Sequence, residues 1–264
     1  GAGGGVPERL AFVLADRLVL RRVRRVFGGS VRYLISGSAP MPGWLLEWYD
    51  AVGLPVYEAY GVSENVVPVA MNRPGARRAG TVGRPRAQNE VRIAPDGEIA
   101  VRGAGVFREY LGAARAPRPD AEVFWATGDV GELAADGYLR LTGRKADAFK
   151  TAAGRWVVPA EIEARLRRAA YVEFALVVRA GAGVPVAILN VDPAQLGGTV
   201  RAERIAADAA AALDGLPAHA RPAGFVVVTA PFSIAAGDLT TNLKPRRAAI
   251  AAVAVNDFVT YLGF

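Results

Sequence analysis

Residues 31–61 contain a strand, a helix and a second strand in close succession, and this order limits the fold more than any other feature of the chain. Two short apolar runs, at 31–35 and 55–60, flank an aromatic-rich segment over 42–52 that predicts a helix. Turns that contain glycine follow both runs. This unit is typical of a parallel α/β sheet. Ligands of such sheets bind at the carboxyl ends of the strands, where we expect the two turns to lie.

The segments on either side of this unit predict different structures. Residues 7–27 have apolar positions at helical spacing and predict an amphipathic helix. From about residue 80, short strands alternate with hairpin turns such as Asp96-Gly97 and Asp136-Gly137. This second pattern indicates an antiparallel β-subdomain.

After residue 146 strands are mixed with longer helices. The predicted elements are a helix over 159–168, strands over 172–178 and 185–191, a helix over 200–213 and a strand over 225–228. We therefore predict an α/β chain with two domains. They are residues 1–145, made of an α/β unit (1–79) and a β-subdomain (80–145), and a small α+β domain (146–264).

The residue types present exclude several kinds of active site. The sequence has no cysteine and a single histidine, His219, so thiolate nucleophiles, cysteine-based metal sites and histidine-based triads are not expected. The net charge of +7 comes from scattered arginines without a nucleic-acid-binding motif, and we expect no nucleic-acid partner. No apolar run reaches the roughly 20 residues of a membrane span, and we predict a cytoplasmic protein.

Lysine is rare and unevenly placed. Only Lys145, Lys150 and Lys244 occur among the 32 basic residues. An ammonium group is a compact point charge, whereas a guanidinium group is a planar fork, so the choice of lysine in an arginine-rich chain indicates a chemical reason. Two of the lysines flank the predicted domain boundary and the third lies near the C-terminus.

Three polar segments could carry chemistry, and each has an ordinary structural alternative. Residues Tyr60–Glu64 place a hydroxyl and a carboxylate after a strand, where they could bind phosphate and a hard cation, but a turn with Ser63 as a helix N-cap fits equally well. Thr127–Asp129 could grip sugar hydroxyls or form an Asx-turn. Residues 143–150 are dense in charge, and a solvated connection between domains is the alternative.

The order and spacing of these segments resemble the core motifs of the AMP-forming adenylating enzymes, which include acyl-CoA synthetases, peptide-synthetase adenylation domains and luciferases. The resemblance runs from about residue 10 to the end. The matching segments are Tyr60–Glu64, Gly97–Gly103, Thr127–Asp129, Gly143–Arg144 with Asp147 and Lys150, and Lys244. Bacterial long-chain fatty-acid CoA ligases are resembled most, through Ala15–Leu20, Ser36–Pro40, Gly80–Pro85 and Leu243–Arg247.

This resemblance implies that the chain is the C-terminal half of an acid–thiol ligase. Such an enzyme would convert a carboxylic acid, fatty or related, and ATP to acyl-AMP and would then transfer the acyl group to CoA. ATP/AMP, Mg²⁺ and CoA are the implied cofactors. The chain would supply the end of the large AMP-binding domain and a mobile small domain. A bacterial enzyme of fatty-acid metabolism or of secondary-metabolite biosynthesis fits this description.

The resemblance also implies roles for individual residues. The wall of the adenine pocket would be formed by Gly37, Ser38, Ala39 and Tyr60, with Tyr60 stacked on the ring, and Gly61 would also bind the cofactor. Ser63 would contact the α-phosphate and Glu64 would hold magnesium.

Three further roles follow from the same resemblance. Asp129 would accept both ribose hydroxyls, and Arg144 would reinforce the ribose and phosphate contacts. Lys244 would neutralise the charge between the substrate carboxylate and the α-phosphate as the transition state forms. Lys244, Glu64 and Ser63 are thus the expected catalytic residues.

Three positions depart from the family pattern. Ala146 stands where an Asp or Lys usually serves as the hinge of the small domain, so we expect no polar latch at the hinge. Ser63 replaces the more usual Thr and keeps the hydroxyl. Asn65 replaces a Thr or Ser and is expected to alter the acyl or phosphate side of the pocket.

The phosphate-binding loop of the family's N-terminal region has no counterpart in this sequence. We expect that N-terminal half to exist as a separate piece, since an open parallel sheet without its neighbours exposes edges and apolar faces. Three alternatives stay open. The protein could form thioesters only from preformed acyl-adenylate, alone or with a partner, could load the pantetheine of a carrier protein, or could be a non-catalytic domain that senses nucleotide or CoA.

Overall fold

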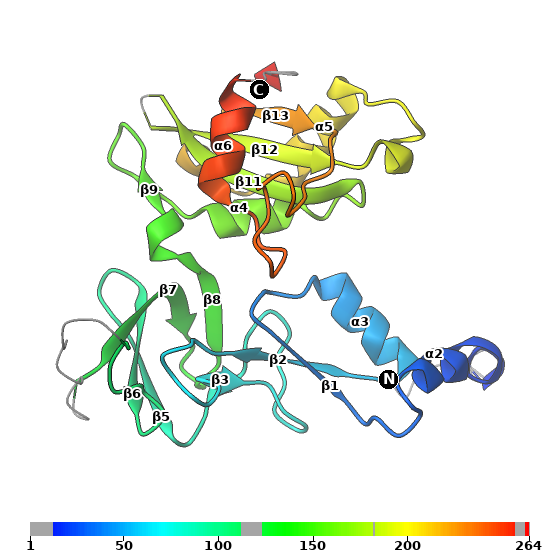
Figure 1. The fold of residues 1–264 in the computed structure, drawn as a ribbon, viewed down its shortest axis with the longest axis vertical. Helices are drawn as coiled ribbons and strands as arrows, with labels where there is room; N and C mark the ends of the chain where they lie inside the picture. Colours follow the sequence, from blue (N-terminus) through cyan, green and yellow to red (C-terminus); the bar gives the residue numbers. More distant parts are fainter. Residues whose placement is uncertain (1–12, 112–122, 182, 257–261, 264) are drawn as a thin grey trace. The chain divides into compact units, whose positions relative to one another are not determined.

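The computed structural model describes residues 13–111, 123–181, 183–256 and 262–263. The chain divides into two compact units, Gly1–Leu141 and Thr142–Phe264 (Figure 1). The sequence placed the domain boundary after residue 145. Strand β8 (Leu139–Arg144) crosses the division between the units.

The predicted strand–helix–strand unit forms the first sheet of unit 1. Its elements are β1 (Leu34–Gly37), α3 (Gly43–Val52) and β2 (Val56–Tyr60). The two strands are parallel, as predicted, and β3 (Ala70–Met71) and β4 (Arg84–Pro85) extend the sheet in antiparallel fashion. Strand β1 begins at Leu34 instead of Val31, because its partner strand supplies hydrogen bonds only from Pro55 onward.

The N-terminal helical segment is described from residue 13, so the predicted start at residue 7 lies outside the described residues. A π-helical turn, η1 (Asp16–Leu20), leads into α2 (Arg21–Val26). Arg24 pairs with Asp16 at 2.6 Å and donates to the carbonyl of Val52 at 2.8 Å. These two contacts tie α2 to the end of α3.

The second sheet of unit 1 is the predicted antiparallel β-subdomain. Its strands are β5 (Asn89–Ile93), β6 (Glu98–Gly103), β7 (Trp125–Leu133) and β8, in that order. One buried cluster joins this sheet to the first, and its members are Tyr60, Val69, Ala70, Ile99, Val101 and Leu139. The two sheets of unit 1 therefore share a core.

Unit 2 is an α+β domain, as the alternation of patterns predicted. Its elements are η2 (Lys145–Asp147), β9 (Phe149–Lys150), β10 (Trp156–Val157), α4 (Pro159–Leu166), β11 (Val172–Ala180), β12 (Val184–Val191), η3 (Pro193–Leu196), α5 (Ala202–Ala212), η4 (Ala218–Ala220), β13 (Gly224–Val228), α6 (Arg247–Asn256) and β14 (Leu262–Gly263). The strands β11 to β14 form one sheet in chain order.

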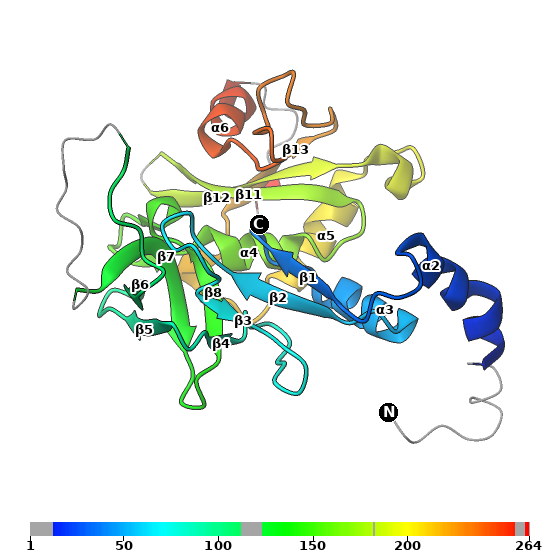
Figure 2. The same cartoon turned by 60° about the horizontal axis from the view of Figure 1, so that its bottom comes forward.

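Both faces of this sheet are covered by helices, which explains why β11 and β12 are nearly continuous apolar runs. Successive side chains of a strand point to opposite faces. Val177 and Leu189 pack in one cluster with residues of α4 and α5, and Leu176 and Ile188 pack in another with Ile250 of α6. Figure 2 shows α6 on one side of β11 and β12 and α4 and α5 on the other.

In the part of the chain that the structure describes, no helix is both long and apolar enough to cross a bilayer.

Candidate active site

The parallel pairing of β1 and β2 brings the two predicted turns to one edge of the sheet. Gly37 is opposite Ala59, so the turn after β1 starts level with the end of β2. A Cβ atom on Gly37 would lie 3.2 Å from the carbonyl oxygen of Ala59, and Ser38 has a left-handed backbone with φ of 69°. Such backbone strain in a non-glycine residue persists where its surroundings impose it. The expectation that both turns share the carboxyl edge is confirmed.

A buried carboxylate that the sequence did not reveal supports this edge. Glu58 lies in β2 and is 9% exposed, and its Oε1 accepts a hydrogen bond from the backbone N–H of Met41 at 3.2 Å. Burial raises the pKa of Glu58, while the Met41 hydrogen bond and nearby Arg77 act in the opposite direction. Glu58 thereby anchors the far end of the turn that holds Gly37 and Ser38.

Tyr60 and Asp129 are in direct contact. The Tyr60 hydroxyl donates to Oδ2 of Asp129 at 2.7 Å, and the two residues are 5% and 6% exposed. This hydrogen bond fixes the orientation of a buried carboxylate at the carboxyl end of β2. The ring of Tyr60 belongs to the core of unit 1, and its stacking on adenine stays a prediction.

Thr127–Asp129 is part of strand β7 and not a turn, so both the polar-turn and the Asx-turn interpretations were wrong about the backbone. The pairing of β6 with β7 is irregular here: Glu98 is opposite Val130, but Ala100 is opposite Ala126. Three residues of β7 therefore bulge opposite one residue of β6, with Gly128 at φ of 76°.

Side chains of the neighbouring strand and of the bulge itself hold it in place. The Thr127 hydroxyl donates to the carbonyl of Ile99 at 2.8 Å, and the N–H of Gly128 donates to Glu98 at 2.9 Å. The N–H of Asp129 donates back to the Thr127 hydroxyl at 3.1 Å. The bulge re-aims the strand, and this directs Asp129 toward Tyr60.

Ser63 and Glu64 lie in a turn that the N–H of Asn65 closes by donating to the carbonyl of Val62 at 3.0 Å. No helix follows within residues 65–111, so Ser63 caps no helix and that alternative was wrong. Asn65 is 4% exposed and donates to the carbonyl of Val67 at 2.5 Å. This hydrogen bond ties Asn65 into its own segment, and its expected effect on the acyl or phosphate side of the pocket stays a prediction.

Tyr110 is a second residue that the sequence did not single out. Its hydroxyl donates to Oε1 of Glu64 at 2.7 Å, which raises the pKa of Tyr110. A backbone hydrogen bond links the same two segments: the N–H of Phe107 donates to the carbonyl of Glu64 at 2.7 Å. The Phe107 ring packs against the Tyr110 ring in a tilted arrangement, with centroids 4.7 Å apart. The segment after β6 therefore supports the predicted magnesium ligand.

The donor set suits magnesium that arrives with a phosphate ligand. Among the described residues, no group of three His, Cys, Asp or Glu side chains could by itself cage a metal. Magnesium is commonly bound through one or two carboxylates together with substrate phosphates and water. A single half-buried carboxylate at Glu64 fits that mode and does not fit a dedicated protein cage.

Arg144 and Lys244 belong to unit 2. Arg144 ends β8 and directly precedes η2. The charge-dense segment 143–150 thus forms strand, 3₁₀-helix and strand in turn, and since Arg144, Lys145 and Lys150 are exposed, the solvated connection still fits it. Within it, the Lys150 ammonium lies 5.1 Å above the Trp156 ring of the β9–β10 hairpin.

Lys244 lies in an exposed, tightly hydrogen-bonded loop over 240–245. The N–H of Lys244 donates to the Thr240 hydroxyl at 3.0 Å, and the N–H of Thr240 donates to the carbonyl of Lys244 at 2.8 Å. Leu243 has a left-handed backbone with φ of 57°. The loop therefore presents the lysine side chain to solvent at the tip of a defined turn.

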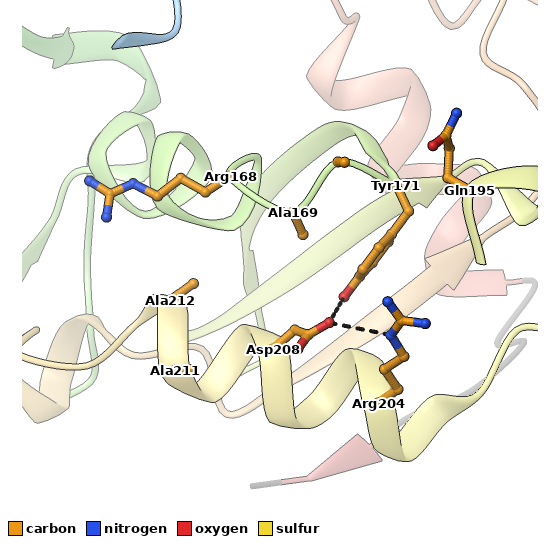
Figure 3. A pocket seen from close by; sticks show the side chains of 9 residues that line it. Arg168, Ala169, Tyr171, Gln195, Arg204, Asp208, Ala211 and Ala212 are labelled. Atoms are coloured by element: carbon orange, nitrogen blue, oxygen red, sulfur yellow. Dashed lines mark hydrogen bonds and ion pairs between the residues drawn. The ribbon is translucent and has the colours of Figure 1, made fainter. Parts of the chain in front are cut away.

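A hollow of about 430 Å³ on unit 2 contains none of the predicted site residues (Figure 3). Tyr171 and Arg204 both point toward Asp208 there: the Tyr171 hydroxyl donates at 2.8 Å and the guanidinium lies 3.8 Å away. Burial, followed by the hydrogen bond to Asp208, raises the pKa of Tyr171. This cluster links α5 to the start of β11.

Comparisons with known proteins agree with this arrangement. Residues 4–111 match the family described as AMP-binding enzyme. The long-chain-fatty-acid–CoA ligase FadD15 of Mycobacterium bovis is 38% identical over 195 residues, covering 72% of this chain and 32% of the relative. The chain thus spans about a third of the length of that relative.

Two solved ligases have a similar fold. The anthranilate CoA ligase AuaEII in complex with anthranoyl-AMP is 25% identical, with a TM-score of 0.71 over 86% of this chain and 45% of that one. O-succinylbenzoate CoA synthetase from Bacillus subtilis, in complex with ATP and magnesium, is 26% identical, with a TM-score of 0.66 over 82% of this chain and 46% of that one. Residues 4–111 therefore belong to the AMP-binding enzyme family by their sequence, and the chain shares its fold with these two ligases.

Proposed function

We propose that this chain is the C-terminal part of an AMP-forming acyl-CoA ligase. The main support is the buried Tyr60–Asp129 pair at the carboxyl edge of a parallel sheet, next to the strained turn at Ser38. A fixed, buried carboxylate can accept hydrogen bonds from both hydroxyls of a ribose, as acidic residues do in other nucleotide sites. The relatives named as CoA ligases support the reaction class.

The reaction proceeds in two steps in which the substrates supply the nucleophiles. A carboxylate oxygen attacks the α-phosphorus of ATP, and pyrophosphate leaves to give acyl-AMP. The thiol sulfur of CoA then attacks the acyl carbon, and AMP leaves as the thiol proton passes to solvent. The absence of cysteine from the sequence does not conflict with this scheme.

The side chains of the site bind and neutralise charge. Asp129 holds the ribose, Ser63 contacts the α-phosphate, and Arg144 adds a second cationic contact. Lys244 is a point charge placed to balance the negative charge that develops at the α-phosphate. Magnesium, when held by Glu64 and the phosphates, would offset further phosphate charge.

The proposed substrate is a fatty or related carboxylic acid, because the sequence relative is named for long-chain fatty acids. The proposed acceptor is CoA, with a carrier-protein pantetheine as the alternative. We also propose that a further N-terminal polypeptide, as a separate piece, completes the enzyme, and that it acts in the cytoplasm, where ATP and CoA are available.

Lys244→Ala in the complete enzyme separates the two steps. Removing the point cation is expected to slow acyl-AMP formation about 100-fold, comparable to the loss of one charge-stabilising group in other enzymes. Thioester formation from supplied acyl-AMP is expected to stay within about three-fold, since the proposed role of Lys244 is confined to attack of the carboxylate on the α-phosphorus. Pyrophosphate release and CoA consumption are measured separately.

The results of these measurements test the role of Lys244 and the proposed function separately. An equal loss of both steps would contradict the role of Lys244. Failure of the unmutated enzyme to bind AMP or a non-hydrolysable acyl-adenylate in a calorimetric titration would contradict the proposed function itself. CoA consumption from acyl-AMP without any pyrophosphate release from ATP would favour an enzyme restricted to the second step.

A further inference from the structure

The guanidinium of Arg247 contacts three separate elements of unit 2. It pairs with both carboxylate oxygens of Glu163 in α4, at 2.5 and 3.3 Å. It donates to the carbonyl of Val177 in β11 at 3.1 Å. Its Nε lies 3.5 Å from Oδ1 of Asp147 in η2. A planar fork with several donors is suited to bridging such partners, whereas lysine is not.

The two partners of Arg247 differ in burial. The Glu163 side chain is 13% exposed and also accepts a hydrogen bond from the N–H of Val177 at 2.7 Å, so this side of the cluster is built into the core. The Asp147 side chain is 39% exposed. Loss of Arg247 would therefore affect the core, whereas loss of Asp147 would remove only the contact with η2.

The contact between Asp147 and Arg247 matters because of where Asp147 lies in the chain. It is the last residue of η2 (Lys145–Asp147), the hinge segment, in which Ala146 is the expected pivot. The absence of a polar side chain at Ala146 led us to expect no latch there. The structure instead shows a polar contact one residue later, the ion pair between Asp147 and Arg247.

Arg247 also ends the connection that carries Lys244. It is the first residue of α6, and only Arg246 separates it from the Lys244 loop (240–245). Three of the loop's hydrogen bonds run between its own residues: those from the N–H of Thr240, Leu243 and Lys244. A loop held in this way keeps its shape while its orientation depends on how its ends are anchored.

We propose that Arg247 is a positioning residue that joins the hinge segment to the Lys244 loop. The pair with Asp147 makes the loop follow the hinge, and the pair with Glu163 ties both to α4. The catalytic part of this assignment rests on the proposed function, in which Lys244 acts in acyl-AMP formation. The link between hinge and loop is a property of unit 2 and stands apart from any reaction.

The test uses Asp147→Asn and Arg247→Gln in the complete enzyme. Each is expected to lower the kcat of acyl-AMP formation, about 10-fold for Asp147→Asn and up to about 100-fold for Arg247→Gln, because small misplacements of a reacting group have effects of this size. The KM for ATP and the rate of thioester formation from supplied acyl-AMP are expected to change less than about three-fold. The proposed role of Lys244 concerns neither ATP binding nor the second step. Arg247→Lys keeps the positive charge but lacks the planar fork of donors. Its kcat for acyl-AMP formation is expected to lie between those of Arg247→Gln and the unmutated enzyme.

Arg165→Gln is the matched control. Arg165 also lies in unit 2 and pairs with Glu161 at 3.0 Å within α4, but it contacts neither η2 nor the loop among its hydrogen bonds. Its removal is expected to leave both half-reactions within about two-fold, as is usual for an exposed pair. A double variant, Asp147→Asn with Arg247→Gln, is expected to be no slower than Arg247→Gln alone, because coupled residues are not additive.

Hydrogen exchange of the 264-residue chain tests the link without any reaction. Asp147→Asn is expected to speed exchange of the Leu243 and Lys244 amides at least three-fold, while amides of β12 exchange as before. Unchanged exchange at both amides would overturn the proposal, as would a parallel loss of both half-reactions in Asp147→Asn. Failure of the unmutated enzyme to form acyl-AMP would contradict the proposed function, and hydrogen exchange would then decide on the link alone.

Discussion

A buried carboxylate with a fixed donor is the most informative single-residue feature of unit 1. Asp129 is 6% exposed and accepts a hydrogen bond from Tyr60, which comes from the other sheet. A buried charge is tolerated where hydrogen bonds and charges stabilise it. The hydroxyl of Tyr60 therefore contributes to the stability of the fold as well as to the orientation of Asp129.

Tyr60→Phe tests both contributions. Removal of the hydroxyl is expected to lower the free energy of unfolding by about 1–3 kcal/mol, because it takes one donor from a buried acceptor. AMP affinity of the complete enzyme is expected to fall about 5- to 10-fold as Asp129 loses its fixed orientation. Urea unfolding and calorimetric titration measure the two effects. Unchanged AMP affinity together with lower stability would assign Tyr60 a purely structural role.

Glu58 predicts a pH dependence of stability. Burial raises its pKa above the ordinary value of 4.5, so the protonated form is favoured in the folded state. The stabilisation that this provides is complete at pH values below the unfolded pKa and is lost as the pH rises through the folded pKa. The folded state thus disfavours the ionised carboxylate relative to the unfolded state.

Glu58→Gln keeps the acceptor for the Met41 N–H and removes the ionisation. The variant is expected to match the unmutated protein in stability near pH 4 and to gain on it as the pH rises toward 7. Urea unfolding at a series of pH values between these limits measures the difference. A constant difference across the series would mean that ionisation of Glu58 contributes nothing.

At the level of elements, close backbone contacts decide where glycine is required. Gly80 and Gly83 both have left-handed backbones, with φ of 73° and 81°, in the segment that leads into β4. A Cβ atom on Gly80 would meet nothing within 4 Å, whereas one on Gly83 would lie 2.1 Å from the backbone nitrogen of Asn72. The two glycines share the same left-handed backbone conformation and differ only in the room available for a Cβ atom.

Alanine substitutions at these positions separate strain from collision. Gly80→Ala is expected to cost about 1–2 kcal/mol, the penalty of a left-handed backbone for a residue with a Cβ atom. Gly83→Ala is expected to cost at least about 3 kcal/mol, because β3 and β4 must move apart to admit the methyl group. Urea unfolding measures both. Equal costs would show that the backbone around Asn72 yields easily.

At the level of the whole molecule, the apolar clusters respect the division into two units. The cluster that contains Ile99 draws only on residues before 142, and the cluster that contains Leu189 draws only on residues after 142. Hydrophobic stabilisation is proportional to the apolar area that each cluster removes from water. Each unit therefore has its own source of stability.

Differential scanning calorimetry of the chain is expected to show two unfolding transitions. Leu189→Ala is expected to lower one transition and Ile99→Ala the other, each by a destabilisation of about 2–5 kcal/mol in its own unit. Both residues are at most 1% exposed, so the two substitutions create comparable cavities. A single transition that both variants lower equally would show that the units unfold as one.

Much of the fold could be predicted from the sequence because local patterns determine it. Apolar runs and helical patterns placed α3, β2, α4, β11, β12 and α5 to within a few residues. Hairpin signals located the turn between β5 and β6 at Asp96-Gly97. The motif residues taken singly left ordinary turns as alternatives, and it was the resemblance of their order and spacing to a known family that implied a nucleotide site.

Local residue patterns therefore specify the elements and the chemical types available at their ends. Which residues meet depends on how these elements pack. Asp129 reaches Tyr60 through a bulge in β7, and Asp147 reaches Arg247 across the small domain. These contacts depend on strand register and on helix packing, which join residues far apart in the chain and leave no periodic signal in it. For the same reason the buried Glu58 and the Tyr110–Glu64 hydrogen bond became visible only in the folded protein.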